Sequence, residues 1–223
     1  MTEAPFQRQW HTTADGSQTL WIPEWDESYH SRHGAVQEAL HVFLQHGYQA
    51  HRAQPLQLLE MGLGTGLNAL LTLDAALADG REVHYTGVEA YPLTPTEYQS
   101  LDFSAWVQPE AALLYPALMD APWERPVALH PLFTLHKCLS RFESFQAQAA
   151  FDLIYYDAFG YRVQPELWSE AMMQAMYEAL RPGGILTTYA CRKPIIDHLK
   201  AAGFTVQKKP GPPGKREMLM AFK

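Results

Sequence analysis

The stretch LQLLEMGLGTGLN, residues Leu56–Asn68, decides the fold of this chain. Its first part, Leu56–Met61, is a short apolar run of the kind that forms a buried strand. The run leads into the glycine-rich turn GLGTG at 62–66, and a helix is predicted over Asn68–Ala78, ending at Gly80. A strand, a glycine-rich turn and a helix in this order predict the first unit of an open α/β sheet, where ligands lie beyond the carboxyl ends of the strands.

The rest of the chain repeats this alternation of strands and helices. Further strands are predicted at Val83–Val88, Phe133–Leu135, Phe151–Tyr156 and Ile185–Tyr189, with helices at Leu167–Leu180 and Ile195–Ala202. A last antiparallel pair is predicted at Phe204–Gln207 and Glu217–Phe222, joined by the loop KKPGPPGKR. Strands that alternate with helices form a mostly parallel sheet. We therefore expect an α/β, Rossmann-like fold with a closing antiparallel hairpin.

The residues before the glycine-rich unit form a small extension. TADGSQTLWIPEW predicts a hairpin that turns at Asp15 and Gly16. A helix is predicted over Ala35–Gln45, with Gly47 as its end. The expected organisation is an N-terminal extension at 1–48, made of this hairpin and helix, followed by a Rossmann-like domain at 49–223.

Composition indicates a globular protein with a substantial core. Apolar residues make up 47% of the chain and charged residues 18%. With two cysteines, no long apolar run and no apolar leader at the N-terminus, we expect a cytoplasmic protein without a disulfide framework or a membrane partner.

The charges are distributed unevenly along the chain. The net charge is −7, but the part from Arg181 to Lys223 holds nine basic and two acidic residues. This basic end can hold a polyanion locally, or it can simply be a solvated surface.

The glycine spacing separates two classes of cofactor. Dinucleotide folds use G-x-G-x-x-G and place a pyrophosphate at the helix N-terminus. Here the spacing is G-x-G-x-G, and the acidic Glu60 precedes it, which suits a ligand with a cationic amino group and a sulfonium. The pattern resembles the first motif of S-adenosylmethionine methyltransferases. Glu89, at the end of the next strand, is placed to accept both ribose hydroxyls, whereas Glu60 can alternatively cap backbone amides of the turn.

A candidate reaction site follows the strand Phe151–Tyr156. Asp157 comes at its end, in the sequence YYDAF, and a carboxylate there can hold an amine and accept its proton. Phe159 can pack against a flat substrate or shield a sulfonium. The alternative interpretations are a turn cap for Asp157 and a core residue for Phe159.

Several motifs together resemble one family. GLGTGLN, GVEAYPLT, YYDAF followed by QPELW, RPGG and the ending GPPGKREML are similar, in this order, to the MnmC-type tRNA methyltransferases, and YHSRHGA with ALHVFL also matches in kind. The resemblance runs from about Thr13 to the C-terminus. It implies a stand-alone methyltransferase form that converts 5-aminomethyl-2-thiouridine to 5-methylaminomethyl-2-thiouridine at the tRNA wobble position.

The resemblance also implies roles for individual residues. The cofactor, S-adenosylmethionine, would be bound by Glu60, Gly62, Gly64, Gly66, Asn68 and Glu89. Asp157 would act at the target amine, and the tRNA would be contacted by Tyr29, Ser31, Phe159, Lys215 and Arg216. Alternatively, Lys215 and Arg216 would hold the last hairpin. Lysine and arginine suit the phosphates of tRNA, and an extruded base would be bound by stacking and edge hydrogen bonds.

Two segments depart from the family pattern. After DAF the family continues with Ala-Pro and a lysine, whereas this chain has Gly160-Tyr161-Arg162-Val163. The acidic residue expected after the third strand is replaced by Ser140-Arg141-Phe142-Glu143. Either Glu143 takes its place or backbone groups hold the adenine.

The sequence leaves alternative functions open. A small-amine methyltransferase or an aminopropyltransferase-like enzyme would use the same kind of fold, and a non-catalytic cofactor-binding partner protein would keep only the cofactor site. A nicotinamide dehydrogenase ranks last because the glycine spacing differs. Ten histidines, including His30 and His33, form no H-E-x-x-H pattern and the chain has no C-x-x-C, so no metal is expected.

Overall fold

The computed structural model describes residues 6–32 and 34–223, and its centre is an eight-stranded mixed sheet. The strands lie in the order β10-β11-β9-β8-β4-β5-β7-β6. Their bounds are β4 Leu56–Met61, β5 Val83–Glu89, β6 Pro126–His130, β7 Phe133–Leu139, β8 Phe151–Tyr156, β9 Leu180–Thr188, β10 Thr205–Pro210 and β11 Glu217–Phe222. The predicted Rossmann-like fold is confirmed.

The five central strands are parallel, and both edges are antiparallel. β4 pairs in parallel with β5 and β8, β5 with β7, and β8 with β9. The predicted closing hairpin, β10–β11, joins the sheet through antiparallel pairing of β11 with β9. The opposite edge strand, β6, pairs antiparallel with β7 and was not predicted.

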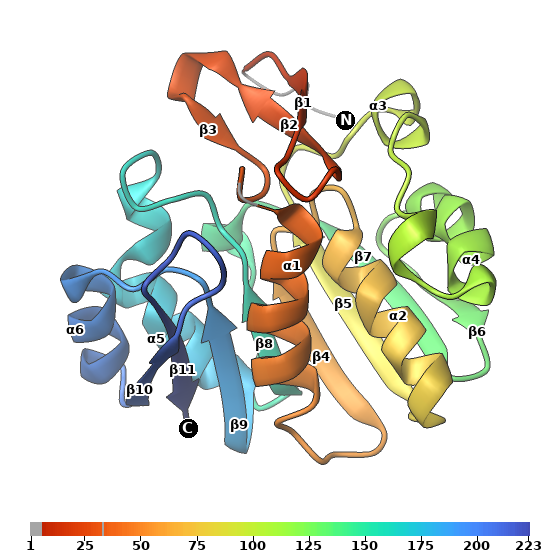
Figure 1. The fold of residues 1–223 in the computed structure, drawn as a ribbon. Helices are drawn as coiled ribbons and strands as arrows, with labels where there is room; N and C mark the ends of the chain where they lie inside the picture. Colours follow the sequence, from red (N-terminus) through yellow and green to blue (C-terminus); the bar gives the residue numbers. More distant parts are fainter. Residues whose placement is uncertain (1–5, 33) are drawn as a thin grey trace.

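Helices cover both faces of the sheet (Figure 1), and each face has its own apolar core. Residues of α1 (Ala35–Ala39), α2 (Leu67–Asp79) and α4 (Pro109–Asp120) pack in one core with Leu56 and Leu58 of β4. Residues of α5 (Glu170–Ala179) and α6 (Lys193–Ala201) pack in the other with Leu59 and Met61. Buried strands of this kind are apolar on both faces because helices exclude water from each.

A separate three-stranded sheet lies above the carboxyl ends of the parallel strands (Figure 1). It consists of β1 (Gln9–Thr12), β2 (Gln18–Ile22) and β3 (Glu27–Ser28), so the predicted hairpin at Asp15-Gly16 is present. A short helix, α3 (Pro95–Gln99), follows β5. His33 lies outside the described residues, and the division at residue 48 stays a prediction.

Two helical predictions need correction. The helix that begins at Ala35 does not end at Gly47, because it continues as a π-helix, η2 (Leu40–Tyr48). Gly47 instead allows close packing, since a Cβ there would lie 2.8 Å from the Tyr155 ring. The predicted helix Leu167–Leu180 is divided into a short turn at Pro165–Trp168 and α5, which Ser169 caps by accepting a hydrogen bond from the Met172 amide.

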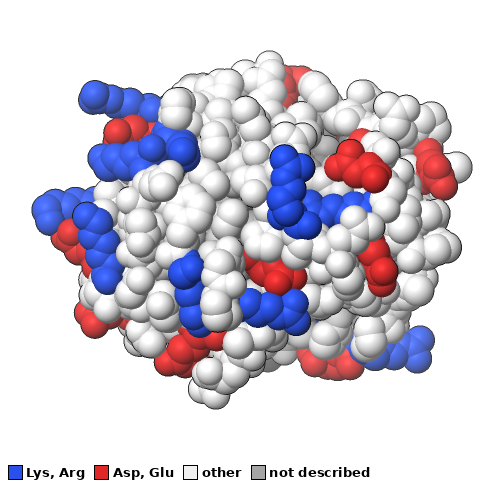
Figure 2. All heavy atoms as spheres, turned by 90° about the horizontal axis from the view of Figure 1, so that it is seen from below, with Lys and Arg blue, Asp and Glu red and all other residues white. Residues whose placement is uncertain are grey.

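The surface at the far end of the sheet from β1–β3 carries charges of both signs. Figure 2 shows lysine and arginine side chains interspersed with aspartate and glutamate there, without a continuous basic area. Among the described residues, no helix combines the length and the apolar character that crossing a bilayer requires.

Candidate active site

A cavity of about 550 Å³ lies where the three-stranded sheet meets the carboxyl ends of the parallel strands. This volume falls within the usual range for small-molecule sites. The structure brings most of the predicted site residues together in its wall: Tyr29, Ser31, Gly62, Gly64, Asn68, Glu89, Asp157, Phe159 and Lys215. Glu60, Gly66 and Arg216 are predicted site residues that do not line the cavity.

The glycine-rich turn lies against the end of β8. Gly62 has φ +101°, and a Cβ there would lie 2.5 Å from the carbonyl oxygen of Asp157. Gly66, the residue before α2, has φ +73°, and its Cβ would lie 2.7 Å from Met119 Sδ of α4. Residues other than glycine rarely adopt these backbone conformations. Gly62 therefore allows two loops of the site to touch, and Gly66 allows α2 and α4 to touch.

Glu89 is anchored at the end of β5 by backbone amides. Its Oε2 accepts a hydrogen bond from the Gly64 amide at 3.0 Å, and its Oε1 accepts one from the Tyr91 amide at 2.8 Å. Each carboxylate oxygen has two lone pairs, so both retain acceptor capacity toward the cavity. This position agrees with the predicted contact to ribose hydroxyls.

Glu60 lies beneath the cavity wall and is fully buried. Its Oε1 accepts a hydrogen bond from Asn68 Nδ2 at 2.8 Å, and its Oε2 accepts one from the Tyr85 hydroxyl at 2.7 Å. Burial raises the pKa of Glu60 well above its usual range. In this arrangement Glu60 orients Asn68, and any effect on a ligand passes through that side chain.

Asp157 is joined to Glu60 by the same amide. Asn68 Nδ2 donates to Asp157 Oδ2 at 2.9 Å, while Asn68 Oδ1 has no hydrogen-bond partner among the described residues. Burial raises the pKa of Asp157 to about 7, and the nearby charge of Glu38 adds to the increase. A carboxyl group with a pKa near neutrality can both accept and release a proton under physiological conditions.

Aromatic side chains form the roof of the cavity. Phe159 lies between Trp25 and Tyr29, with ring centroids 5.4 and 5.2 Å away and edge-on geometry. The Tyr29 hydroxyl accepts a hydrogen bond from Arg8 Nε at 2.8 Å, and Arg8 also pairs with Glu97 at 3.1 Å. The N-terminal segment is thus held over the site by a buried arginine.

Several residues of the site were missed by sequence reasoning, and His30 is one of them. His30 lies between two hydroxyls, with Nδ1 3.0 Å from Thr19 and Nε2 3.1 Å from Thr65 in the glycine-rich turn. Burial lowers the pKa of His30 to about 4, so the ring is neutral at physiological pH.

Arg8, Glu38 and Tyr189 were also missed, and Glu38 had a detectable signal in the sequence. It lies three residues after Ala35 and four before Val42, which places a charge on an apolar helix face. An acidic residue at such a position is almost always paired or functional.

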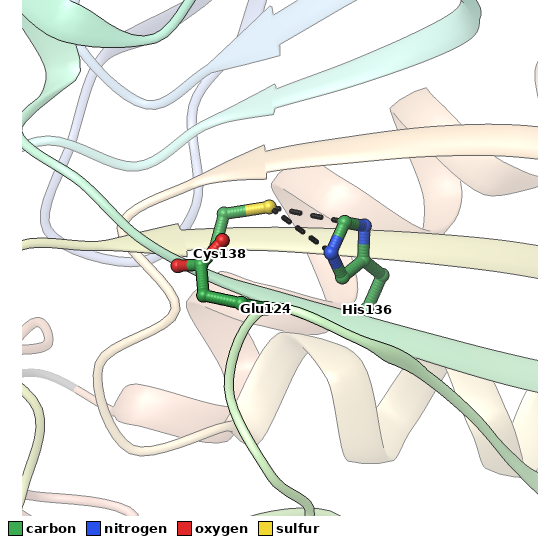
Figure 3. Close-up of side chains that lie close together, drawn as sticks. All are labelled: Glu124, His136 and Cys138. Carbon is green, nitrogen blue, oxygen red and sulfur yellow. Dashed lines mark hydrogen bonds between the residues drawn. The ribbon is translucent and has the colours of Figure 1, made fainter.

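A second group of polar side chains lies away from the cavity, on the strand β7 and the loop before β6. Glu124, His136 and Cys138 lie within 4.8 Å of one another through their ligand atoms (Figure 3). Cys138 Sγ is 3.8 Å from Nδ1 and 3.7 Å from Nε2 of His136. The expectation of no metal stays a prediction.

The C-terminal part of the chain is similar to one known protein family. Residues 134–223, which include Asp157, match the model of a family described as S-adenosyl-L-methionine-dependent methyltransferase. The predicted resemblance is thereby confirmed, and the cofactor that names the family agrees with the glycine spacing.

Curated relatives are similar over almost the whole chain. A protein of Magnetococcus marinus is 33% identical over 225 residues, which cover 95% of this chain and 33% of the relative. A protein of Aeromonas hydrophila is 30% identical, covering 88% and 32%. Both are named tRNA 5-methylaminomethyl-2-thiouridine biosynthesis bifunctional protein MnmC. The chain spans about a third of the length of these relatives.

Solved structures share the fold. MnmC2 from Aquifex aeolicus superposes with a TM-score of 0.78 at 23% identity, covering 97% of this chain and 70% of that chain. Spermidine synthase from Thermotoga maritima superposes with a TM-score of 0.57 at 13% identity, covering 99% and 70%. At these identities the likeness concerns the fold alone.

Proposed function

We propose that this protein transfers a methyl group from S-adenosylmethionine to the amino nitrogen of a 5-aminomethyl group on the wobble uridine of tRNA. The observation that carries the proposal is the position of Asp157. Its carboxyl group lies at the end of β8, in the same cavity as Glu89 and the glycine-rich turn, with a pKa raised to about 7. The names of the curated relatives supply the substrate.

The residues present fit the cofactor. Glu89 offers acceptors where ribose hydroxyls would lie, and the buried Asn68 Oδ1 offers an unpaired acceptor for a donor such as an amino group. When bound, S-adenosylmethionine supplies an electrophilic methyl carbon, whose bond to sulfur breaks with its electron pair left on sulfur.

The chain's own residues prepare the nucleophile. The amine must be neutral to attack, because its lone pair forms the new nitrogen–carbon bond. Asp157 is placed to hold the amine by a hydrogen bond and to accept the proton that the nitrogen gives up. The aromatic roof of Trp25, Tyr29 and Phe159 restricts the substrate base, so that alignment supplies much of the rate.

Basic side chains around the cavity suit a nucleic-acid substrate. Arg32 and Arg141 are exposed and belong to the cavity wall. Phosphates flanking an extruded base would lie near such cations.

The test is methyl transfer by the full chain from labelled S-adenosylmethionine to tRNA that carries 5-aminomethyluridine, followed by nucleoside analysis. We expect a 5-methylaminomethyl product, none from tRNA with unmodified uridine, and a loss of at least a hundredfold in rate for Asp157→Asn. Cofactor binding measured separately should survive in that variant.

Two other results would change the assignment. Transfer to putrescine but not to tRNA would favour a small-amine enzyme, and tight cofactor binding without any transfer would favour a non-catalytic partner protein.

A further inference from the structure

A second carboxylate faces the cavity, and the proposed mechanism does not use it. Glu38 lies on α1, is 8% exposed and belongs to the cavity wall together with Asp157. The two carboxylates are close enough for the charge of Glu38 to raise the pKa of Asp157. A buried carboxylate without a structural network of its own requires an explanation.

The partner of Glu38 is an ammonium group from the opposite end of the chain. Lys215 Nζ lies 2.5 Å from Glu38 Oε2 and 3.7 Å from the centroid of the Tyr189 ring. Lys215 belongs to the loop between β10 and β11, and its side chain is 30% exposed. A carboxylate on one side and an aromatic face on another are the chemistry by which proteins bind ammonium groups.

This arrangement resembles the ligand that the cavity is proposed to take. An aminomethyl group is a primary amine, as the lysine side chain is, and such amines are mostly protonated at neutral pH. The Lys215 ammonium therefore occupies a position that suits the substrate's own ammonium. Its flexible stem and partial exposure allow the head group to leave.

We propose that Glu38 and the ring of Tyr189 form the binding site for the substrate's ammonium group, and that Lys215 fills this site until the substrate displaces it. The inference rests on the proposed function. In the bound state Glu38 would hold the ammonium and one N–H proton would pass to the Asp157 carboxylate. This would free the nitrogen lone pair that methyl transfer needs, while the electron pair of the broken carbon–sulfur bond would stay on sulfur.

Such a site would discriminate between charged and uncharged groups on the substrate base. A hydroxymethyl group carries no charge, so it cannot replace the Lys215 ammonium beside Glu38. The site would then reject a 5-hydroxymethyl analogue because binding it would leave a buried carboxylate without a cation.

The experiment measures steady-state transfer to 5-aminomethyluridine tRNA by Glu38→Gln and Lys215→Met, together with cofactor affinity and the pH profile of kcat. Matched controls are Glu217→Gln and Lys208→Met, which break the exposed Lys208–Glu217 pair of the same hairpin, 2.9 Å long and outside the cavity wall.

For Glu38→Gln we expect KM for the RNA to rise about tenfold to a hundredfold, the loss typical of one charge-assisted hydrogen bond, with cofactor affinity unchanged. The midpoint of the pH profile should move to lower pH, because the charges that face Asp157 are Glu38, which raises its pKa, and Lys215, which lowers it. A purely structural role for Glu38 would not move this midpoint.

For Lys215→Met we expect KM to fall and the midpoint to move to higher pH. A rise in KM would make Lys215 a phosphate contact and overturn the displacement. An unchanged KM and midpoint in Glu38→Gln, while the wild-type protein transfers methyl to the RNA, would overturn the ammonium site alone. If the wild-type protein transfers no methyl group to this RNA, the proposed function itself is wrong.

Discussion

Replacing Asp157 by asparagine should make the protein more stable at high pH while it removes activity. The substitution keeps the side-chain shape and the hydrogen bond from Asn68 Nδ2, but it removes the ionisation. The folded-state pKa of Asp157 is raised from 3.8 to about 7, mainly by burial. Between these values the unfolded chain has lost the proton and the folded chain has kept it, so this group's contribution to stability falls as pH rises and levels off above about pH 7.

The magnitude follows from the size of the shift. About 3 pKa units at roughly 1.4 kcal/mol each set an upper bound of about 4 kcal/mol. Because Asp157 borders the cavity and part of it meets solvent, we expect about half of this, or about 2 kcal/mol. Asparagine does not ionise and has no such cost. The part of the stability difference between Asp157→Asn and the wild-type protein that comes from ionisation should therefore be near zero at pH 4 and largest at pH 8.

The assay is urea unfolding of wild-type protein and Asp157→Asn at pH 4 and pH 8. The change in the stability difference between the two pH values isolates ionisation, because the fixed effect of exchanging the group cancels. A difference that stays constant with pH would refute the raised pKa, and with it the role of Asp157 as a proton acceptor near neutrality.

Three further predictions concern the rest of the site. Glu89→Gln should weaken S-adenosylmethionine binding about tenfold or more in calorimetry, because a carboxylate accepts stronger hydrogen bonds than an amide; unchanged affinity would separate Glu89 from the cofactor. Gly66→Ala should destabilise the fold by about 2 kcal/mol or more in urea unfolding, whereas Gly80→Ala, with φ +63° and open space around its Cβ, should cost only about 1 kcal/mol; equal costs would exclude the contact with Met119. As pH falls from 6.5 to 4, the wild-type protein should lose about 3 kcal/mol of unfolding free energy through His30, because the folded-state pKa is lowered to about 4 and the unfolded chain binds the proton first. His30→Gln should abolish this loss, and identical pH profiles of stability for the two proteins would contradict a buried neutral ring.

Much of the architecture follows from local sequence patterns. The strands Leu56–Met61 and Phe151–Tyr156 were predicted with the bounds that the structure shows, because runs buried on both faces are mostly apolar, and these two are followed by a glycine and by an aspartate. α4 and the edge strand β6 were missed. Pro116 lies inside α4, and β6 is partly exposed and only five residues long, so neither has a strong periodic signal.

The sequence by itself determined which cofactor chemistry to expect, because the glycine spacing and the acids at strand ends are local features of a known topology. It could not determine which of the acidic residues line the cavity and which are buried beneath it or paired with another side chain. Only the tertiary structure buries Glu60 beneath Asn68, places Gly66 against α4, and brings Glu38 of α1 beside Lys215 of the last hairpin. The physical reason is that desolvation and charge pairing depend on which distant segments pack together, and residues 38 and 215 become neighbours only after the sheet has formed.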